Sequence, residues 1–309
     1  MATRSDLSLD SSFFVACELT HRALKAGLKS VSDLSVTQFR ALVKLVAAAP
    51  TGLAQSDLAA LLDIKANVAS QVVNALEGKR LVKRHKRAKG DGRIRDVRIT
   101  KEGTALVDRA NKAIVEQLYS LFPTQNKAYR SILEASIAAG ANIDPPLSKE
   151  AAKRYFASRT LVSLELIRKA MEDALRGTCG ASFNECLVLM KLGEANAPLR
   201  IGDLAHQLQL TPVTVARSVD RLAGRSWAQR LASPVDRKAV FASATPQGSE
   251  VQRLIARTVD EVAQTFLWSR LDEGQSLALA EAGHVVLADM QAREEAERKA
   301  ALDLLEPIG

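Results

Sequence analysis

One segment of the chain occurs twice, 146 positions apart. Ser56 to Arg84 aligns with Gly202 to Arg230 without a gap. Eight of the 29 columns are identical, at positions 57/203, 58/204, 59/205, 62/208, 73/219, 76/222, 78/224 and 84/230. A chain of 309 residues also exceeds what one compact core usually holds. The repeat therefore predicts two copies of one domain in tandem.

The second copy has the clearer helix signals. Thr211 is a good N-cap residue, and Pro212 stands at the first helical position, where its missing N–H is not needed. Gly224 ends the helix. The positions that follow a helical period and predict a buried stripe are Val215, Val219 and Leu222. The short amphipathic segment 201–210 precedes this helix, with Leu204, Ala205 and Leu208 facing inward. Two short helices joined this tightly predict a helix-turn-helix.

Each helix-turn-helix is followed by a pattern of two short strands around a turn, which predicts a β-hairpin wing. The expected strands span residues 80–87, 93–100, 226–233 and 238–245. Long helical patterns flank each copy. The expected long helices span residues 11–29, 101–122, 149–176 and 246–271.

The boundary between the copies lies in "NIDPPLSKE", where Asp144 and the Pro145-Pro146 pair cannot continue a helix. We therefore expect a first domain at 1–143, a linker at 144–149 and a second domain at 150–309 that ends in a helical tail.

Composition narrows the function. The net charge of +8 and the pI near 9.5 favour a polyanionic partner. No signal peptide or apolar run of membrane-spanning length is found, so a cytoplasmic protein without a membrane partner is expected. Three cysteines without paired spacing indicate neither disulfides nor zinc, and the four histidines show no metal spacing. No phosphate loop, nucleophile elbow or zinc-protease motif is found, so neither an enzyme nor a cofactor is expected.

The order of elements resembles the MarR family of bacterial winged-helix regulators. The most specific match is "TVARSVDRLAGRSWAQR" followed by "PVDRK", which is similar to the family's recognition helix and wing; "LSVTQFRALVKL" and "RITKEG" resemble its second helix and the junction after its wing. Both copies depart from the pattern. The first wing is one residue longer and its recognition helix lacks the Thr cap, and Trp227-Ala228 replaces the usual Leu-Val in the second copy.

The resemblance implies a fold class that is mainly α with small β-hairpin wings (α+β): tandem winged helix-turn-helix domains with long dimerisation-type helices. Members of the family act as homodimers on double-stranded DNA. Here one chain supplies both halves, so the resemblance implies a transcriptional repressor that works as a covalent pseudo-dimer, as a monomer, on a pseudo-palindromic operator with half-sites about 10 base pairs apart. It also implies release by a small aromatic or phenolic effector bound between the outer helices and the winged helix.

The candidate DNA-binding residues lie on the recognition helices and wings. Arg217 is the first candidate, because an exposed Arg can pair with guanine O6 and N7, whereas Asn and Gln suit adenine. The full set is Arg217, Thr214, Val213 and Arg221 on the second recognition helix, Arg237 and Lys238 on the second wing, Asn67, Ser70, Gln71 and Asn74 on the first recognition helix, and Lys86, Lys89, Arg93 and Arg95 on the first wing.

The two halves differ in charge. Residues 79–98 contain ten Lys or Arg against two Asp, whereas 225–243 contain four against one. Since phosphate contacts supply nonspecific affinity, we expect the first half to supply most of the nonspecific affinity for DNA and the second half to make more of the base contacts.

Other interpretations stay open. Arg217 can instead pair with Asp220 or Glu250, and winged helices can serve as protein-docking scaffolds that have lost DNA binding. Cys17 lies where some family members carry a reactive cysteine, but its apolar neighbours "FFVACEL" favour a packed thiol with a raised pKa. Cys179 and Cys186 are also interpreted as packed thiols. The aromatic residues of the outer helices, such as Phe14 and Trp268, fit a core better than a ligand pocket.

Overall fold

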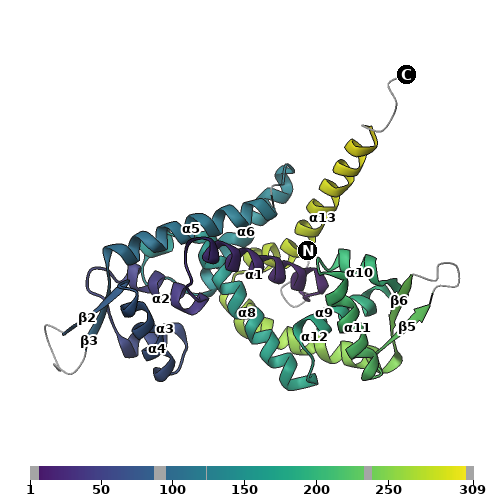
Figure 1. Cartoon of the computed structure of the whole chain (residues 1–309), viewed down its shortest axis with the longest axis horizontal. Coiled ribbons are helices and arrows are strands. Elements are labelled where there is room, and N and C mark those ends of the chain that lie inside the picture. The colour runs from purple at the N-terminus through teal and green to yellow at the C-terminus, as the bar shows by residue number, and fades with distance from the viewer. Residues whose placement is uncertain (1–6, 87–94, 123, 233–238, 304–309) are drawn as a thin grey trace. The chain divides into compact units, whose positions relative to one another are not determined.

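The computed structural model describes residues 7–86, 95–122, 124–232 and 239–303. The fold is mainly helical with two small antiparallel sheets, which confirms the expected fold class (Figure 1). The chain forms two compact units. The first unit comprises His21–Leu121 and Gly140–Ser163, and the second comprises Met1–Thr20, Phe122–Ala139 and Leu164–Gly309. Each unit thus combines segments from both sequence repeats.

The first unit holds one winged helix. Its elements in chain order are α2 (Val36–Ala47), β1 (Leu53–Ala54), α3 (Gln55–Leu62), α4 (Ala66–Gly78), β2 (Val82–Lys86), β3 (Arg95–Ile99) and α5 (Lys101–Leu121). The sheet has the order β1-β3-β2, with Val82 opposite Ile99 and Leu53 opposite Val97. The helix-turn-helix is α3 and α4, and the buried residues of α4 are Ala69, Val72, Val73 and Leu76.

The second unit repeats this order. Its winged helix consists of α9 (Phe183–Ala195), β4 (Leu199–Arg200), α10 (Ile201–Gln207), α11 (Pro212–Gly224), β5 (Ala228–Ala232), β6 (Val240–Ala244) and α12 (Pro246–Phe266). The sheet has the order β4-β6-β5. Thr211 caps α11 by accepting a hydrogen bond from the N–H of Thr214, as predicted. The predicted inward stripes are buried on both helices.

Four helices connect or extend these cores. They are α1 (Ser11–Val31), α6 (Lys127–Ile143), α8 (Phe156–Cys179) and α13 (Glu273–Asp303), with a short α7 (Lys149–Ala152) before α8. Both α1 and α8 are single helices whose residues are divided between the two units. Phe14 and Trp268 are buried, so these aromatic side chains belong to the core, as predicted.

The same backbone junction follows both wings. The hydroxyl of Thr100 accepts from the N–H of Gly103 and donates to the carbonyl of Arg80. Thr245 makes the same two contacts with Gly248 and Ser226. A Cβ on either glycine would collide with a carbonyl oxygen, that of Leu81 or of Trp227. Glycine at these positions therefore lets the long helix pack directly against the start of the wing.

Three features differ from the sequence-based expectations. The helix expected over 149–176 is divided into α7 and α8, because Tyr155 adopts a left-handed conformation with φ of 58°. The helix expected over 246–271 ends at Phe266 and continues as a 3-10 turn, η2 (Trp268–Arg270). Strands β1 and β4 were not expected, because a strand of two residues shows no alternating pattern.

Candidate nucleic-acid interface

The second recognition helix, α11, presents Arg217 and Val213 to solvent, and Val213 is 59% exposed. Thr214 is half-buried, and its hydroxyl lies 2.8 Å from that of Thr211. Among the described residues no ion pair joins Arg217 to Asp220 or Glu250, since Asp220 pairs with Arg230 instead. An exposed large apolar side chain beside a guanidinium that forms no ion pair with another described residue suits the major groove, where a thymine methyl and a guanine lie within reach.

Arg221 is held at the edge of this surface. Its Nε lies 2.8 Å from Oε1 of Glu185 on α9, and Arg221 is 61% exposed while the Glu185 carboxylate is 4% exposed. The other Glu185 oxygen accepts from the backbone N–H of Ser182. This ion pair connects the recognition helix to the capping box at the start of α9. It orients Arg221 and occupies one of its donors.

The first recognition helix, α4, has a polar exposed face. Asn67, Gln71 and Asn74 are exposed and Ser70 is half-buried. Asn74 is already engaged, because its Oδ1 accepts a hydrogen bond of 2.7 Å from Arg84 of the wing. Its predicted role in reading a base therefore requires that this contact open or that its amide nitrogen be used.

An arginine on the first wing strand braces the recognition helix in each half. Arg84 contacts Asn74 and forms an ion pair with Glu77. Its counterpart Arg230 pairs with Asp220, which is the repeat position of Asn74. Sequence reasoning missed this role, although the identity of Arg84 and Arg230 between the copies was the signal for it.

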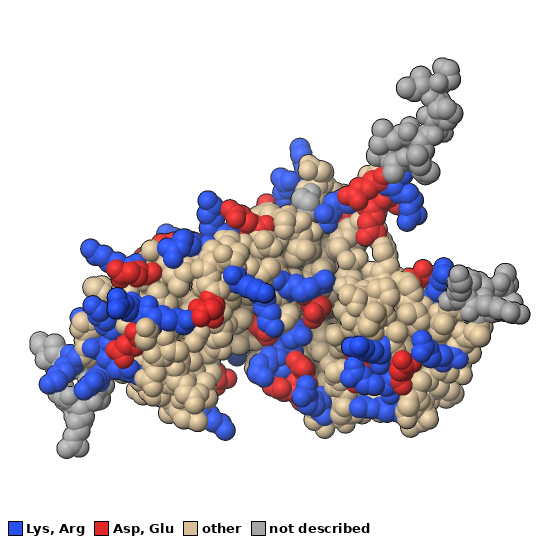
Figure 2. Space-filling model, in the orientation of Figure 1, with Lys and Arg blue, Asp and Glu red and all other residues tan. Residues whose placement is uncertain are grey.

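The first wing carries like charges side by side. Lys86 of β2 lies directly opposite Arg95 of β3, and both are exposed. Like charges in this arrangement are destabilising without a counter-charge, which indicates a surface adapted to an anionic partner. Figure 2 shows Lys and Arg side chains gathered over the end of the first unit that carries β2 and β3. The other wing candidates, Lys89, Arg93, Arg237 and Lys238, lie outside the described residues.

A buried charge cluster anchors α2, the first helix of the first winged helix. Asp144 accepts bonds of 2.9 Å from both Nε and Nη2 of Arg40 and one of 3.1 Å from Lys44. Burial acts to raise the pKa of Asp144, but the hydrogen bonds and charges of the two cations outweigh it, so this pKa is lowered. Burial lowers the pKa of Lys44 despite the carboxylate beside it. The cluster attaches α2 to the segment that follows α6.

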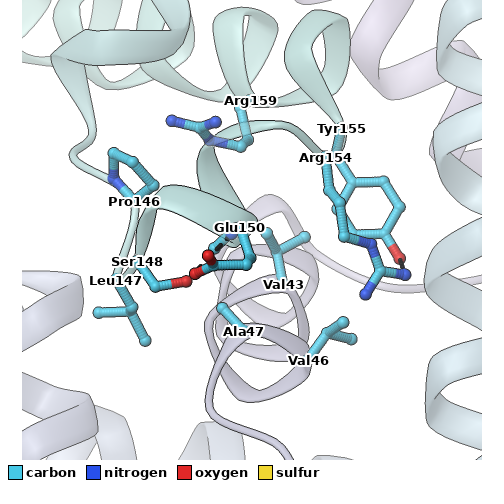
Figure 3. Close-up of a pocket in the computed structure, with 11 residues that line it drawn as sticks. Val43, Val46, Ala47, Pro146, Leu147, Ser148, Glu150, Arg154, Tyr155 and Arg159 are labelled. Atoms are coloured by element: carbon cyan, nitrogen blue, oxygen red, sulfur yellow. Dashed lines mark hydrogen bonds between the residues drawn. The ribbon is translucent and has the colours of Figure 1, made fainter.

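A cavity of about 210 Å³ lies beside this cluster in the first unit (Figure 3). Its lining includes apolar side chains of α2, the residues Pro146 and Leu147, and residues of the segment 148–159. Arg159 lines the cavity and donates hydrogen bonds to the carbonyls of Ala141 and Ala152. Burial lowers the pKa of Arg159. Burial and a hydrogen bond to Asp108 raise the pKa of Tyr155 to about 12, so its hydroxyl stays protonated.

Other kinds of site receive no support within the described ranges. No group of three or more potential ligands is placed to hold a metal ion among the residues whose positions are described. No helix in the same ranges is long and apolar enough to cross a membrane. Cys17 is buried, and burial raises the pKa of its thiol, as its apolar neighbours predicted.

Comparison with known protein families finds matches to two segments of the chain. Residues 32–94 match one model of the MarR family and residues 182–240 match another. Similar solved structures include two MarR family transcriptional regulators from Streptomyces coelicolor. Sco3205, solved in complex with DNA, is 27% identical over 39% of this chain and 76% of its own, with a TM-score of 0.36. AbsC is 20% identical over 46% of this chain and 86% of its own, with a TM-score of 0.33. No curated protein matches the chain.

Proposed function

Because the chain is a tandem fusion of two MarR-type winged-helix segments, we propose that it regulates transcription as a covalent pseudo-dimer. One chain binds one pseudo-palindromic site on double-stranded DNA through α4 and α11, without a second copy. The expected outcome on its target is repression. The proposed base-reading residues are Arg217, Thr214, Val213 and Arg221 in one half and Asn67, Ser70, Gln71 and Asn74 in the other.

The observation that carries this proposal is the reciprocal exchange of outer segments between the repeats. The start of α1 belongs to the second unit, where Phe14 stacks on Phe183 with ring centroids 4.8 Å apart and Ser11 donates to Glu194. Conversely, the start of α8 belongs to the first unit, where Ser158 donates to Asn111. Exchange of outer helices is how two identical subunits would interleave, so one chain has the pairing that separate subunits would otherwise supply.

The test is a titration of the full chain with fragments of the genes that flank its own, repeated across a salt series, with the mass of the complex measured. One chain per site of about 20 base pairs, with a steep salt slope, supports the proposal. Two chains per site would disprove the pseudo-dimer. Retention of no fragment above nonspecific affinity would favour the alternative, a winged-helix scaffold that docks a protein.

We further propose that a small aromatic or phenolic effector binds in the cavity beside α2. The apolar side chains that α2 contributes to the lining suit an aromatic ring, and the cationic side chains Arg154 and Arg159 suit a phenolate or carboxylate. Ligand binding here would act on α2 through the adjacent Asp144 cluster, provided that it favours one arrangement over another. Calorimetric titration with benzoate and with phenol tests this, using Ala47→Phe to fill the cavity. Unchanged binding in that variant would place the effector elsewhere.

A further inference from the structure

The ion pair between Glu185 of α9 and Arg221 of α11 exceeds what the helix cap requires. Oε2 of Glu185 accepts a hydrogen bond of 2.9 Å from the N–H of Ser182 and so completes the capping box. In the first unit, Oε1 of Gln38 accepts a bond of 2.9 Å from the N–H of Ser35. A neutral amide therefore completes this cap as a carboxylate does, and the charge of Glu185 needs another explanation.

The carboxylate and the cation occur together in one half of the repeat and are both missing from the other. Gln38 stands at the position of Glu185 when the capping boxes are aligned, and Ala75 stands at the repeat position of Arg221. The Glu185 side chain is almost fully buried, and a buried carboxylate is costly without a nearby cation. Arg221 supplies that cation, with its Nε 2.8 Å from Oε1 of Glu185. The pair is therefore a feature of the second half alone.

Part of the Arg221 guanidinium remains available for a second anion. A guanidinium has several N–H groups in a rigid planar fork, and Nε carries only one of them. Among the described residues, Glu185 is the only hydrogen-bond or ion-pair partner that the structure gives Arg221, and Arg221 is exposed. The next cation along the chain is engaged elsewhere, because Arg225 donates a hydrogen bond of 3.0 Å to the carbonyl of Gly180. The N–H groups of Arg221 that face away from Glu185 can therefore bind a pair of anionic oxygens.

Arg221 lies at the C-terminal end of the recognition helix, in the last turn before Gly224. It is one turn beyond Arg217 on the same face, or about 6 Å further along the helix axis. A recognition helix contacts base edges with its N-terminal residues. A side chain in the last turn therefore comes closer to the DNA backbone, and Glu185 draws this one toward α9.

We propose that Glu185 is a positioning residue, which holds Arg221 against one backbone phosphate of the half-site that α11 occupies. The proposal rests on the proposed function and refines it, because Arg221 is assigned to the DNA backbone. The residues left to read bases in this half are Arg217, Thr214 and Val213. Two phosphate oxygens match the fork of a guanidinium, and phosphate contacts fix the register of a protein on DNA. The Glu185–Arg221 pair thus fixes where α11 enters the major groove.

The strand ends of the two wings differ in the same sense. Lys86 and Arg95 lie opposite each other on β2 and β3, where they can contact phosphates. The equivalent residues on β5 and β6, Ala232 and Val240, carry no charge. A fixed phosphate contact from Arg221 gives the second half a hold on the DNA backbone that these strand ends do not supply.

The pair predicts opposite effects on two kinds of DNA. A charged Glu185 beside Arg221 gives no net charge, so the pair adds little to the long-range attraction of DNA. Glu185→Gln keeps the cap, as Gln38 shows, and makes the net charge of the protein more positive. We therefore expect weaker binding to the operator, because Arg221 is no longer held, and unchanged or stronger binding to a duplex of random sequence. A role of Glu185 in folding alone would weaken both.

The first test removes the phosphate contact without leaving a buried charge. The double variant Glu185→Gln with Arg221→Ala recreates the Gln38–Ala75 combination of the first half and should keep the denaturation midpoint of the wild type. The affinity of the full chain for the operator should fall about ten-fold. The slope of log K against log salt should become shallower by about 0.9, the value for one phosphate. The single variant Arg221→Ala is the control, because it strands the buried Glu185 carboxylate and should lower the midpoint. An unchanged slope in the double variant would overturn the proposal.

The second test locates the phosphate from the DNA side. Single phosphates of the operator are replaced by neutral methylphosphonates, one at a time through both half-sites. We expect one position in the α11 half-site where the replacement weakens binding of the wild type about ten-fold and leaves binding of the double variant unchanged. The double variant should keep the base preferences of the wild type on operators with single base changes. The absence of such a phosphate would refute the contact, and a lost base preference in its place would assign Arg221 to base reading.

The same measurements separate this proposal from the proposed function. If the wild type prefers an operator over random-sequence DNA but Glu185→Gln weakens binding to both equally, only the positioning role of Glu185 is wrong. If the wild type shows no such preference, the proposed function is wrong and the phosphate contact fails with it.

Discussion

The two winged helices share their capping boxes and differ in what lies beyond them. Ser35 with Gln38 begins α2, and Ser182 with Glu185 begins α9. Aligned on these boxes, Arg40 of the buried charge cluster corresponds to Leu187, which is fully buried in the second half. Conversely, the Glu185–Arg221 pair has no counterpart in the first half, where Gln38 and Ala75 stand at those positions.

This comparison separates the features that both halves share from those in which they differ. The capping boxes of α2 and α9, the glycine junction after the wing and the arginine contact to the recognition helix are present in both halves, whereas the Thr211 cap of α11 has no counterpart at the start of α4. The contacts that anchor α2 and α9 and those around the recognition helices differ between the halves.

The largest expected effect is that of Asp144→Ala on the stability of the first unit. The change leaves Arg40 and Lys44 as buried cations without their shared carboxylate, so the free energy of unfolding should fall by about 3–5 kcal/mol. Denaturant titration measures this. Asp33→Ala, which removes an exposed ion pair with Lys79, is the control and should leave the midpoint unchanged.

The same cluster should respond to acid. The pKa of Asp144 is lowered in the folded protein, so its contribution is fully present above the ordinary Asp pKa of about 3.9 and is lost as the pH falls through the lowered value. The difference in stability between the wild type and Asp144→Ala should therefore shrink below about pH 4. A difference that stays constant with pH would show that the lost contact is not ionic.

The next largest effect concerns base recognition. Arg217→Ala and Gln71→Ala should each remove about 1–3 kcal/mol of discrimination, but at different half-sites. Binding of each variant to operators mutated in one half at a time measures this, and each variant serves as the control for the other. Loss at the same half-site in both variants would mean that α4 and α11 do not divide the operator.

The wings should differ in their response to salt. Lys86 and Arg95 face each other on the first wing, whereas the equivalent pair on the second is Ala232 and Val240. Replacing both charges with Ala should make the slope of log K against log salt shallower by about 1.8, as for two phosphate contacts. The reciprocal variant, Ala232→Lys with Val240→Arg, should steepen it. An unchanged slope in both variants would exclude these strand ends from the DNA contact.

The smallest effect should be the same in both halves. Ser35→Ala and Ser182→Ala each remove an N-cap and should lower the free energy of unfolding by about 1 kcal/mol. Thermal or chemical denaturation measures both. A much larger loss for Ser182→Ala would indicate that the second unit depends on this cap beyond the start of α9, because the connection from α8 to α9 ends at Ser182.

Sequence reasoning succeeded where the signal is local. Thr211 and Pro212 predicted the start of α11, Asp144 with the following prolines predicted the end of α6 at Ile143, and helical spacing predicted the buried stripes. It missed the break at Tyr155 because nothing in the local composition favours a left-handed tyrosine. The proposed DNA-reading set stays a prediction, although the structure adds that Asn74 and Arg221 already have protein partners.

The sequence by itself determined the repeat, the helix-turn-helix in each copy and the basic character of the first wing, because caps, apolar periodicity and charge depend on neighbouring residues. Only the tertiary structure decided that each unit takes segments from both repeats, that Asp144 joins Arg40 and Lys44, and that Glu185 pairs with Arg221. Those contacts depend on where long helices end and which way they turn back. Their direction follows from packing over the whole unit, which no short stretch of sequence specifies.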